Sequence, residues 1–354
     1  MFKRFLLLSW VFFIVSTVDV LAQHQNLPKL YKDKSQSVVL IKTDYRYIDP
    51  DTGRTSYSYF TASGVFIRKY GVILTSKHNI NQTQVIFDKT LGKNVEFELD
   101  TINAIYNEKM YPLSIIALDR QTRLTLLTVR DRSLKFQPVR ISRRNLNVGD
   151  YVFTIANPGR KDNVLKVGIV SSISSNFQNE SEPIRYIFSN LGAERGDSGG
   201  PLFNKYGELI GINEYGSNSV LCASIFLCDK FVKESLYKLL NGHRIERPIL
   251  NISFFDLSAL NREWPTRAKA GFLIEHGLST SLDYGILIID SGQKEMLKDD
   301  VIIRINNIVL TNGHTFYTAL FGSKPHKKII FHVLRGGKIL NIVFTPETED
   351  IIPN

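Results

Sequence analysis

The sequence has few of the features that mark membrane spans, metal centres and disordered chains. After the first 22 residues no apolar run approaches the roughly 20 residues needed to cross a bilayer, which excludes a polytopic membrane protein. Only two cysteines are present, Cys222 and Cys228, without a nearby histidine, and this argues against a zinc site. Hydrophobic residues make up 43% of the 354 residues, which is enough for a core and excludes disorder as the dominant state.

Acidic residues are outnumbered in this chain. The 44 Lys and Arg face 34 Asp and Glu, which gives a formal net charge of +10. A basic surface either binds phosphates or keeps a protein soluble. The basic residues are scattered, Arg143-Arg144 and Lys327-Lys328 are the densest patches, and no nucleic-acid motif accompanies them. We therefore expect no nucleic-acid partner.

The N-terminus has the three-part order of a secretory signal peptide. Two basic residues precede an apolar run over 5–15, and residues 20–22 fit a cleavage site. Asp19 argues against an uncleaved anchor, because a carboxylate inside a bilayer is costly. The sequence predicts a signal peptide at 1–22, an exported chain that is periplasmic or extracellular, and no stable membrane span. In such a compartment the two cysteines either form a small bridged loop or stay as free buried thiols.

From residue 36 to about 240 the chain alternates short β-rich runs with turn signals, which is typical of a sandwich or barrel. The run from Asp229 to Leu240 has helical spacing, and Gly242 follows as a stop. A charged, turn-prone stretch at 241–248 indicates a linker. The second unit beyond it has a short predicted helix and several predicted strands. The helix spans 315–321, and the strands span 285–289, 301–305, 329–334 and 342–344.

The strongest chemical signal is the run of six residues from Gly196 to Pro201, with Ser198 at its third position. A serine hydroxyl is a poor nucleophile and needs a base beside it and donors for the oxyanion that forms. Glycines around the serine let the backbone N–H groups of Gly196 and Ser198 point at one spot. His78 is the only histidine between residues 25 and 242, and it ends a strand-like run. By elimination it is the candidate base.

These segments resemble the trypsin-fold serine proteases of the high-temperature-requirement (HtrA) type, which combine a chymotrypsin-like double β-barrel with C-terminal PDZ domains. The resemblance covers about residues 36–240 and includes the segment around His78 and the nucleophile motif at Ser198. It implies a mostly β fold, with a protease domain at 36–242 and a PDZ-like α+β peptide-binding domain at 249–347. It also implies an endopeptidase for unfolded or damaged proteins, without cofactor or metal, that often forms homotrimers.

One departure from the family concerns the triad acid. Where the family carries its aspartate, this sequence has Arg123. Loss of the acid costs roughly 10⁴ in turnover in the worked trypsin-fold case. A cation there would also oppose the positive charge that develops on His78. Either Arg123 points to solvent and another carboxylate approaches His78, with Asp119 nearest in sequence, or Ser198 and His78 work as a slow dyad. The third alternative is an impaired homologue that acts as a peptide-binding chaperone or sensor.

The resemblance also suggests two binding sites. Gly192 lies six residues before the nucleophile, at the base of the specificity pocket in this fold. Because it carries no carboxylate, we expect substrates with small or aliphatic side chains in that pocket. In the PDZ-like unit a peptide C-terminus would add as a strand, with backbone N–H groups holding its carboxylate. The loop at Gly271 and Phe272 is favoured for this role, and residues 249–252 are the alternative. A PDZ-like fold that serves only as a spacer stays open.

Overall fold

The computed structural model describes residues 27–88, 92–177, 180–214 and 222–351. The predicted signal peptide lies outside these residues. Among the described helices, none has both the length and the apolar character needed to cross a bilayer. Two compact units are present: one comprises the described residues up to Ile173 with Ile187–Cys228, and the other comprises Ser174–Tyr186 and the described residues from Asp229 onward.

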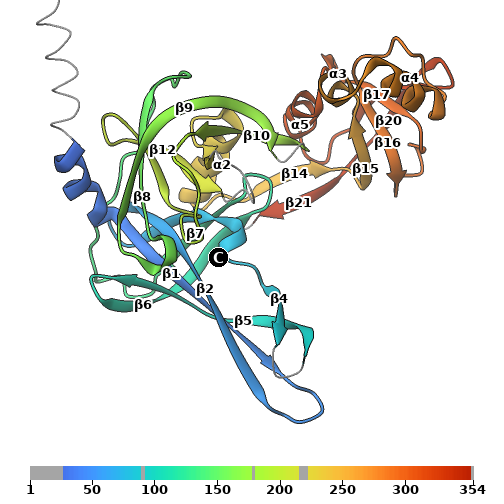
Figure 1. Ribbon diagram of the computed structural model, residues 1–354. Helices are drawn as coiled ribbons and strands as arrows, with labels where there is room; N and C mark the ends of the chain where they lie inside the picture. Colours follow the sequence, from blue (N-terminus) through green and yellow to red (C-terminus); the bar gives the residue numbers. More distant parts are fainter. Residues whose placement is uncertain (1–26, 89–91, 178–179, 215–221, 352–354) are drawn as a thin grey trace, which may run out of the picture. The chain divides into compact units, whose positions relative to one another are not determined.

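The first barrel is built from the N-terminal strands. Pairing in the order β1-β2-β3-β7-β6-β5, with β1 also paired to β5, closes a ring, and β4 adds to β5. Figure 1 shows β1 and β2 as a long hairpin. Alternate side chains such as Val39 and Ile41 enter a core in which Phe66 stacks on Phe136 at 4.3 Å. The strands are β1 (Val38–Ile48), β2 (Thr55–Arg68), β3 (Val72–Ser76), β4 (Thr83–Asp88), β5 (Lys93–Tyr106), β6 (Lys109–Asp119) and β7 (Leu124–Val129).

The second barrel follows in the chain and is closed in the order β10-β13-β12-β11-β8-β9. The mostly β, double-barrel fold is thus confirmed. Its core includes Cys222, whose thiol has its pKa raised to about 12 by burial. Cys222 and Cys228 are both free thiols, so the bridged loop does not form, and Cys222 is buried as the second alternative requires whereas Cys228 is half-buried. The strands are β8 (Tyr151–Ala156), β9 (Val164–Phe177), β10 (Glu180–Ser189), β11 (Pro201–Asn204), β12 (Leu209–Glu214) and β13 (Cys222–Phe226).

Helix α2 (Lys230–Leu240) begins where the sequence places it, because the Asp229 carboxylate accepts the Phe231 N–H as an N-cap. By contacts this helix groups with the second unit rather than with the barrels. Phe231 stacks on Phe321 at 5.2 Å, and the Arg247 guanidinium lies over its ring. The domain limits 36–242 and 249–347 stay predictions.

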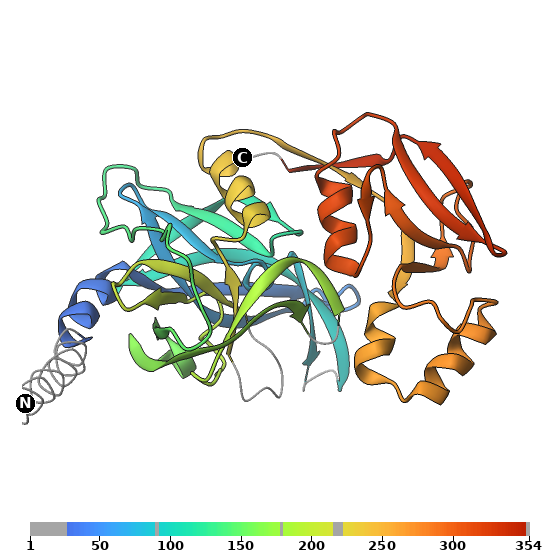
Figure 2. The ribbon, with the colours of Figure 1, turned by 90° about the horizontal axis from the view of Figure 1, so that it is seen from above.

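The second unit carries a separate sheet in the order β15-β16-β17-β19-β20, with β18 paired to β17. Helix α5 (Gly313–Phe321) packs against it through Phe316, and α3 (Ser258–Glu263) and α4 (Thr266–Glu275) pack against it through Leu260 and Leu273 (Figure 2). A two-stranded ribbon pairs β14 (Ile245–Ile249) with β21 (Glu347–Ile351). The sheet strands are β15 (Ile252–Asp256), β16 (Ile286–Ser291), β17 (Val301–Ile305), β18 (Ile308–Val309), β19 (Ile329–Arg335) and β20 (Lys338–Phe344).

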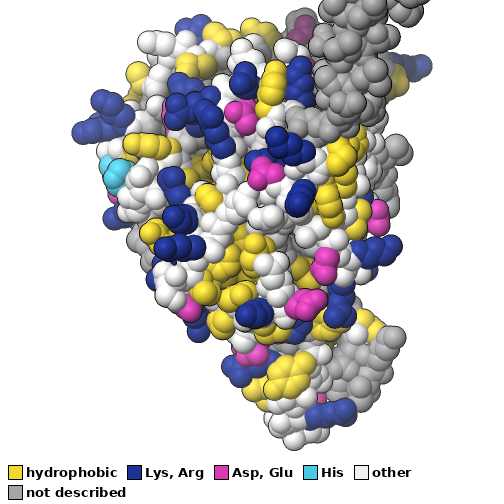
Figure 3. Space-filling model, turned by 90° about the vertical axis from the view of Figure 1, so that its left-hand side faces the viewer, with side chains coloured by type: hydrophobic (Ala, Val, Ile, Leu, Met, Phe, Trp, Pro, Cys, Tyr) yellow, Lys and Arg dark blue, Asp and Glu magenta, His cyan; other side chains and the backbone are white. Residues whose placement is uncertain are grey.

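The surface charge is dispersed on the face that Figure 3 presents. Lys and Arg side chains are spread among polar, acidic and hydrophobic ones. This distribution is what the scattered basic residues of the sequence predict.

Candidate active site

The nucleophile and the base meet between the two barrels. Ser198 lies in the loop that leads from β10 into β11, and His78 lies in the short 3₁₀ turn η2 (Lys77–Asn79) directly after β3. The Ser198 hydroxyl is hydrogen-bonded to Nε2 of His78. Ser198 is buried and the His78 side chain is 37% exposed, so the imidazole reaches solvent and a substrate. The structure therefore brings together the two residues that the sequence singled out.

A carboxylate that the sequence argument missed lies behind the imidazole. Oε1 of Glu214 is 2.8 Å from Nδ1 of His78, and its other oxygen accepts the hydroxyl of Ser76. Glu214 ends β12, all six residues of which are buried, and its side chain is 5% exposed. A buried carboxylate needs partners. The acidic residue in this otherwise uncharged strand was therefore the sequence signal that could have identified Glu214 as a site residue. Nothing local identified the partner, which is 136 residues away.

The first alternative required Arg123 to point to solvent. In the structure its side chain stays beside the active-site residues. It lies in the turn between β6 and β7 with a φ of 57°, and its Nη1 is 3.8 Å from Oε1 of Glu214. Its carbonyl accepts the Lys77 N–H at 2.7 Å, which ties this turn to the residue before His78. The arginine thus faces the carboxylate rather than solvent alone.

Asp119 does not take the position of the acid, and this corrects the prediction. It is fully buried at the end of β6, where Oδ1 accepts the backbone N–H groups of Gln121 and Thr122 at 3.0 and 3.2 Å. These bonds close the turn that leads to Arg123. The carboxylate that meets Nδ1 of His78 is that of Glu214.

The loop before Ser198 has the shape of an oxyanion site. Gly196 has a φ of 102°, and a Cβ there would lie 2.5 Å from the Asn157 carbonyl oxygen, so only glycine fits. The Arg195 carbonyl accepts the Gly159 N–H at 2.9 Å, and in a planar trans peptide this turns the Gly196 N–H the opposite way. Within the described residues, neither this N–H nor that of Ser198 donates to a backbone carbonyl.

Ser63 of β2 holds this loop against the first barrel. Its hydroxyl donates to the Gly196 carbonyl at 2.7 Å and accepts the Asn157 N–H at 2.9 Å, and its own N–H donates to the Ser198 carbonyl. Ser63 is fully buried, so these bonds are not exchanged with water. The oxyanion loop is therefore positioned by both barrels.

An ion pair also supports the loop from β9. Nζ of Lys166 lies 2.6 Å from Oδ2 of Asp197 and 2.9 Å from Oε1 of Glu194. The same Asp197 oxygen accepts the Glu194 N–H at 2.7 Å. The hydrogen bond and charge of Lys166 hold the pKa of the exposed Glu194 carboxyl below its usual range. Asp197 is buried, so its carboxylate depends on this lysine.

Gly192 lies in the turn after β10 with a φ of 68°, and a Cβ there would meet nothing within 4 Å. The neighbouring stretch 215–221 lies outside the described residues. The preference for small or aliphatic side chains therefore stays a prediction.

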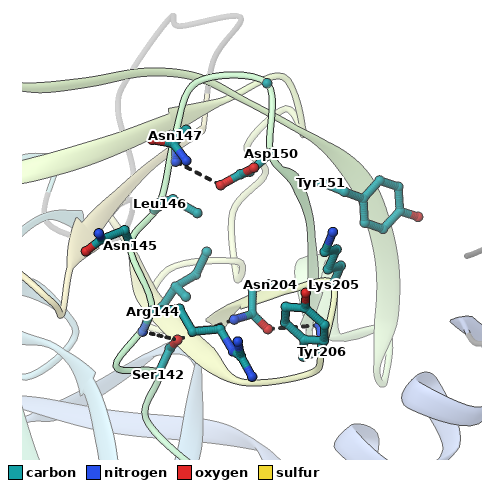
Figure 4. A pocket seen from close by; sticks show the side chains of 12 residues that line it. Ser142, Arg144, Asn145, Leu146, Asn147, Asp150, Tyr151, Asn204, Lys205 and Tyr206 are labelled. Carbon is teal, nitrogen blue, oxygen red and sulfur yellow. Dashed lines mark hydrogen bonds between the residues drawn. The ribbon is translucent and has the colours of Figure 1, made fainter.

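A separate cavity of about 440 Å³ opens elsewhere on the barrels (Figure 4). Arg144, Asp150 and Tyr206 are among the residues that line it. Ser142 also lines this cavity, and its hydroxyl donates a hydrogen bond to Glu208. No histidine is among the described residues of this lining that could act as its base. No group of three His, Cys, Asp or Glu side chains in the described part of the chain could hold a metal ion.

The predicted carboxylate loop at Gly271 and Phe272 is wrong, because both residues lie inside helix α4. N–H groups in a helix interior are already bonded to carbonyls four residues back. Phe272 instead packs on Phe255 and Trp264 at 5.3 and 5.4 Å.

The alternative stretch, 249–252, connects β14 to β15. Strand β15 forms one edge of the described sheet. Its Phe254 lies 5.1 Å from Phe316 and 5.9 Å from Tyr317 of α5. Strand addition of a peptide requires an edge strand, and β15 is one in the described sheet.

Comparison with known proteins gives matches over most of the chain. The family described as "Trypsin-like peptidase domain" matches residues 62–212. Serine endoprotease DegS of Haemophilus influenzae is 27% identical over 79% of this chain and 75% of its own length. Periplasmic pH-dependent serine endoprotease DegQ of Escherichia coli is 26% identical over 81% of this chain, but the match spans only 59% of that protein.

Solved structures share the fold. The chain titled "HtrA-type protease AlgW with decapeptide" aligns with a TM-score of 0.66 at 18% identity, over 92% of this chain and 98% of its own. A serine endoprotease of Yersinia pestis aligns with a TM-score of 0.59 at 19% identity, over 92% and 97% of the two chains.

Proposed function

We propose that this chain, which is an HtrA-type serine protease, is catalytically active and uses Ser198 as nucleophile and His78 as general base. The observation that carries the proposal is the continuous contact from Ser198 through His78 to Glu214. The alternative of an impaired homologue rested on the missing acid at position 123. A carboxylate at Nδ1 of His78 removes that reason.

In this proposal Ser198 Oγ attacks the scissile carbonyl carbon while its proton moves to Nε2 of His78. The carbonyl electron pair goes to oxygen, and the N–H groups of Gly196 and Ser198 stabilise that oxyanion. Collapse of the adduct breaks the C–N bond, and His78 gives its proton to the leaving amine. Water then attacks the acyl-enzyme by the same path, which releases the acid and restores Ser198.

We further propose that the substrates are unfolded or damaged proteins outside the cytoplasm. The signal-like N-terminus supports export, and the DegQ relative is described by its name as periplasmic. The second unit would act as a PDZ-like module that takes a peptide C-terminus at the β15 edge, with the loop at 249–252 holding the carboxylate. Homotrimer formation stays a prediction.

The test is degradation of casein by the purified mature chain, beside Ser198→Ala. We expect the parent to degrade casein and the variant to lose activity at least about a thousandfold, because the nucleophile is removed. Both proteins should unfold at the same urea concentration. Equal casein loss with parent and variant, or none with either, contradicts the proposal.

A further inference from the structure

We propose that the catalytic acid of this protease has been relocated: Glu214 of the second barrel is the triad acid, and Arg123, at the position of the family's aspartate, is a positioning residue for it. The inference rests on the proposed function of Ser198 and His78. It turns the residue that suggested inactivity into part of the active site.

The first step is the contact at the imidazole. Glu214 Oε1 lies 2.8 Å from Nδ1 of His78, a normal length for a charge-assisted hydrogen bond. The acceptor on this side selects the tautomer whose Nε2 takes the serine proton, which is the role of the triad acid. Ser76, two residues before His78, donates to the other oxygen and keeps the carboxylate from rotating away.

The second step is the burial of that carboxylate. The Glu214 side chain is only 5% exposed, and an unpaired carboxylate at such a site is costly. Arg123 supplies a permanent positive charge at 3.8 Å. That distance is too long for a direct hydrogen bond, so the guanidinium neutralises the carboxylate while the nearer His78 keeps the Oε1 contact.

The third step is the placement of Arg123. The bond between the Lys77 N–H and the Arg123 carbonyl fixes the arginine beside the histidine turn. The two charged residues are therefore coupled: the carboxylate of Glu214 from β12 is stabilised by the cation of Arg123 from the β6–β7 turn. An aspartate introduced at 123 would add a second carboxylate beside Glu214 and remove its cation.

The experiment compares the full mature chain with Glu214→Gln, Arg123→Asp and the double variant Arg123→Asp/Glu214→Gln. The readouts are kcat and KM on a fluorogenic casein and the rate at which a fluorophosphonate phosphonylates Ser198 with loss of fluoride. Glu208→Gln is the matched control, because Glu208 also faces an arginine, Arg144, outside the site. We expect kcat of that control to stay within about twofold of the parent, because Glu208 is bonded to Ser142 and Arg144 rather than to His78 or Ser198.

For Glu214→Gln we expect kcat to fall by about 10³–10⁴ with little change in KM. Arg123→Asp alone should lower kcat at least about tenfold, because two carboxylates then repel each other beside one imidazole. The double variant should recover about tenfold over Glu214→Gln, since it carries a single carboxylate at the family's position. Arg123→Lys, which keeps the charge, should retain more activity than Arg123→Gln.

Three outcomes overturn the inference. If Glu214→Gln keeps the kcat of the parent, Glu214 is not the triad acid. If Arg123→Asp has a higher kcat than the parent, the arginine disables the site. A double variant no better than Glu214→Gln removes the coupling. Failure of the proposed function is distinguishable: neither the parent nor Arg123→Asp would then degrade casein or react with the fluorophosphonate, and the inference falls with it.

Discussion

At the scale of single residues, the buried carboxylates of this site each lie near one cationic side chain, in addition to their hydrogen-bond donors. Glu214 faces Arg123, and Asp197, directly before the nucleophile, faces Lys166. A buried charge loses its water and is stabilised only by such contacts. Loss of the partner is therefore more harmful than loss of the whole pair.

Lys166→Met tests this dependence at the oxyanion loop. The change leaves Asp197 buried without its cation, and we expect the free energy of unfolding to fall by about 3 kcal/mol. We also expect kcat to fall by about a hundredfold, because the N–H groups of Gly196 and Ser198 lose their support. Urea denaturation and casein cleavage measure the two effects.

The matched variant for this prediction is Lys166→Met/Asp197→Asn. Its neutral amide can still accept the Glu194 N–H, so at least half of the lost stability should return. If the single variant is as stable as the parent, the ion pair does not support the loop.

At the scale of elements, the predicted peptide-binding loop at Gly271 lies in a helix of the second unit, whereas an edge strand of its sheet lies at β15. Gly271 belongs to α4, where its N–H is used inside the helix. The edge of β15, in contrast, has backbone groups open to a partner strand and the aromatic side chains of α5 beside it. The proposed strand addition of a peptide is therefore placed at the β15 edge rather than at α4.

A peptide with an apolar C-terminus should bind the full chain, and amidation of its carboxylate should weaken binding at least about tenfold, as loss of a charged hydrogen-bond partner does. Tyr317→Ala in α5 should weaken binding too, because it removes the aromatic ring that lies 5.9 Å from the Phe254 ring of β15. Gly271→Ala should leave binding unchanged and stabilise the protein by about 0.5–1 kcal/mol, since its Cβ meets nothing within 4 Å. Fluorescence anisotropy and urea denaturation provide the readouts. Loss of binding in Gly271→Ala would restore the loop that the structure rejects.

At the scale of the whole molecule, the formal net charge is +10, and on the face that Figure 3 presents the Lys and Arg side chains are spread rather than gathered in one patch. Phosphate binding by a protein grows with the number of cations that meet one polyanion. Dispersed lysines and arginines meet few phosphates at once. We therefore expect weak binding to polyanions.

Heparin and DNA columns test this distribution. We expect the full mature chain to pass through both at about 0.15 M salt, where contacts between exposed charges are largely screened. Arg143→Gln/Arg144→Gln, at one of the densest patches, should elute within a small salt increment of the parent. Retention well above that salt concentration would show a basic groove and contradict the scattered arrangement.

Much of the fold was predictable because its signals are local. The strand runs, the helical run from Asp229 to Leu240 and the helix at 315–321 depend on neighbours a few residues apart, and the structure has α2 and α5 at these places. The carboxylate loop failed for a local reason as well. A glycine next to an aromatic residue suits a loop, but Phe272 gains more by packing on Phe255 and Trp264 from within a helix.

The active site divides in the same way. The sequence by itself determined the nucleophile motif at Ser198, the lone histidine of its domain and the absence of the family's aspartate. Only the tertiary structure decided which carboxylate replaces that aspartate. Hydrogen bonds act over about 3 Å, whereas Glu214 lies 136 residues from His78 along the chain. The packing of the two barrels against each other closes that distance, and no local pattern records it.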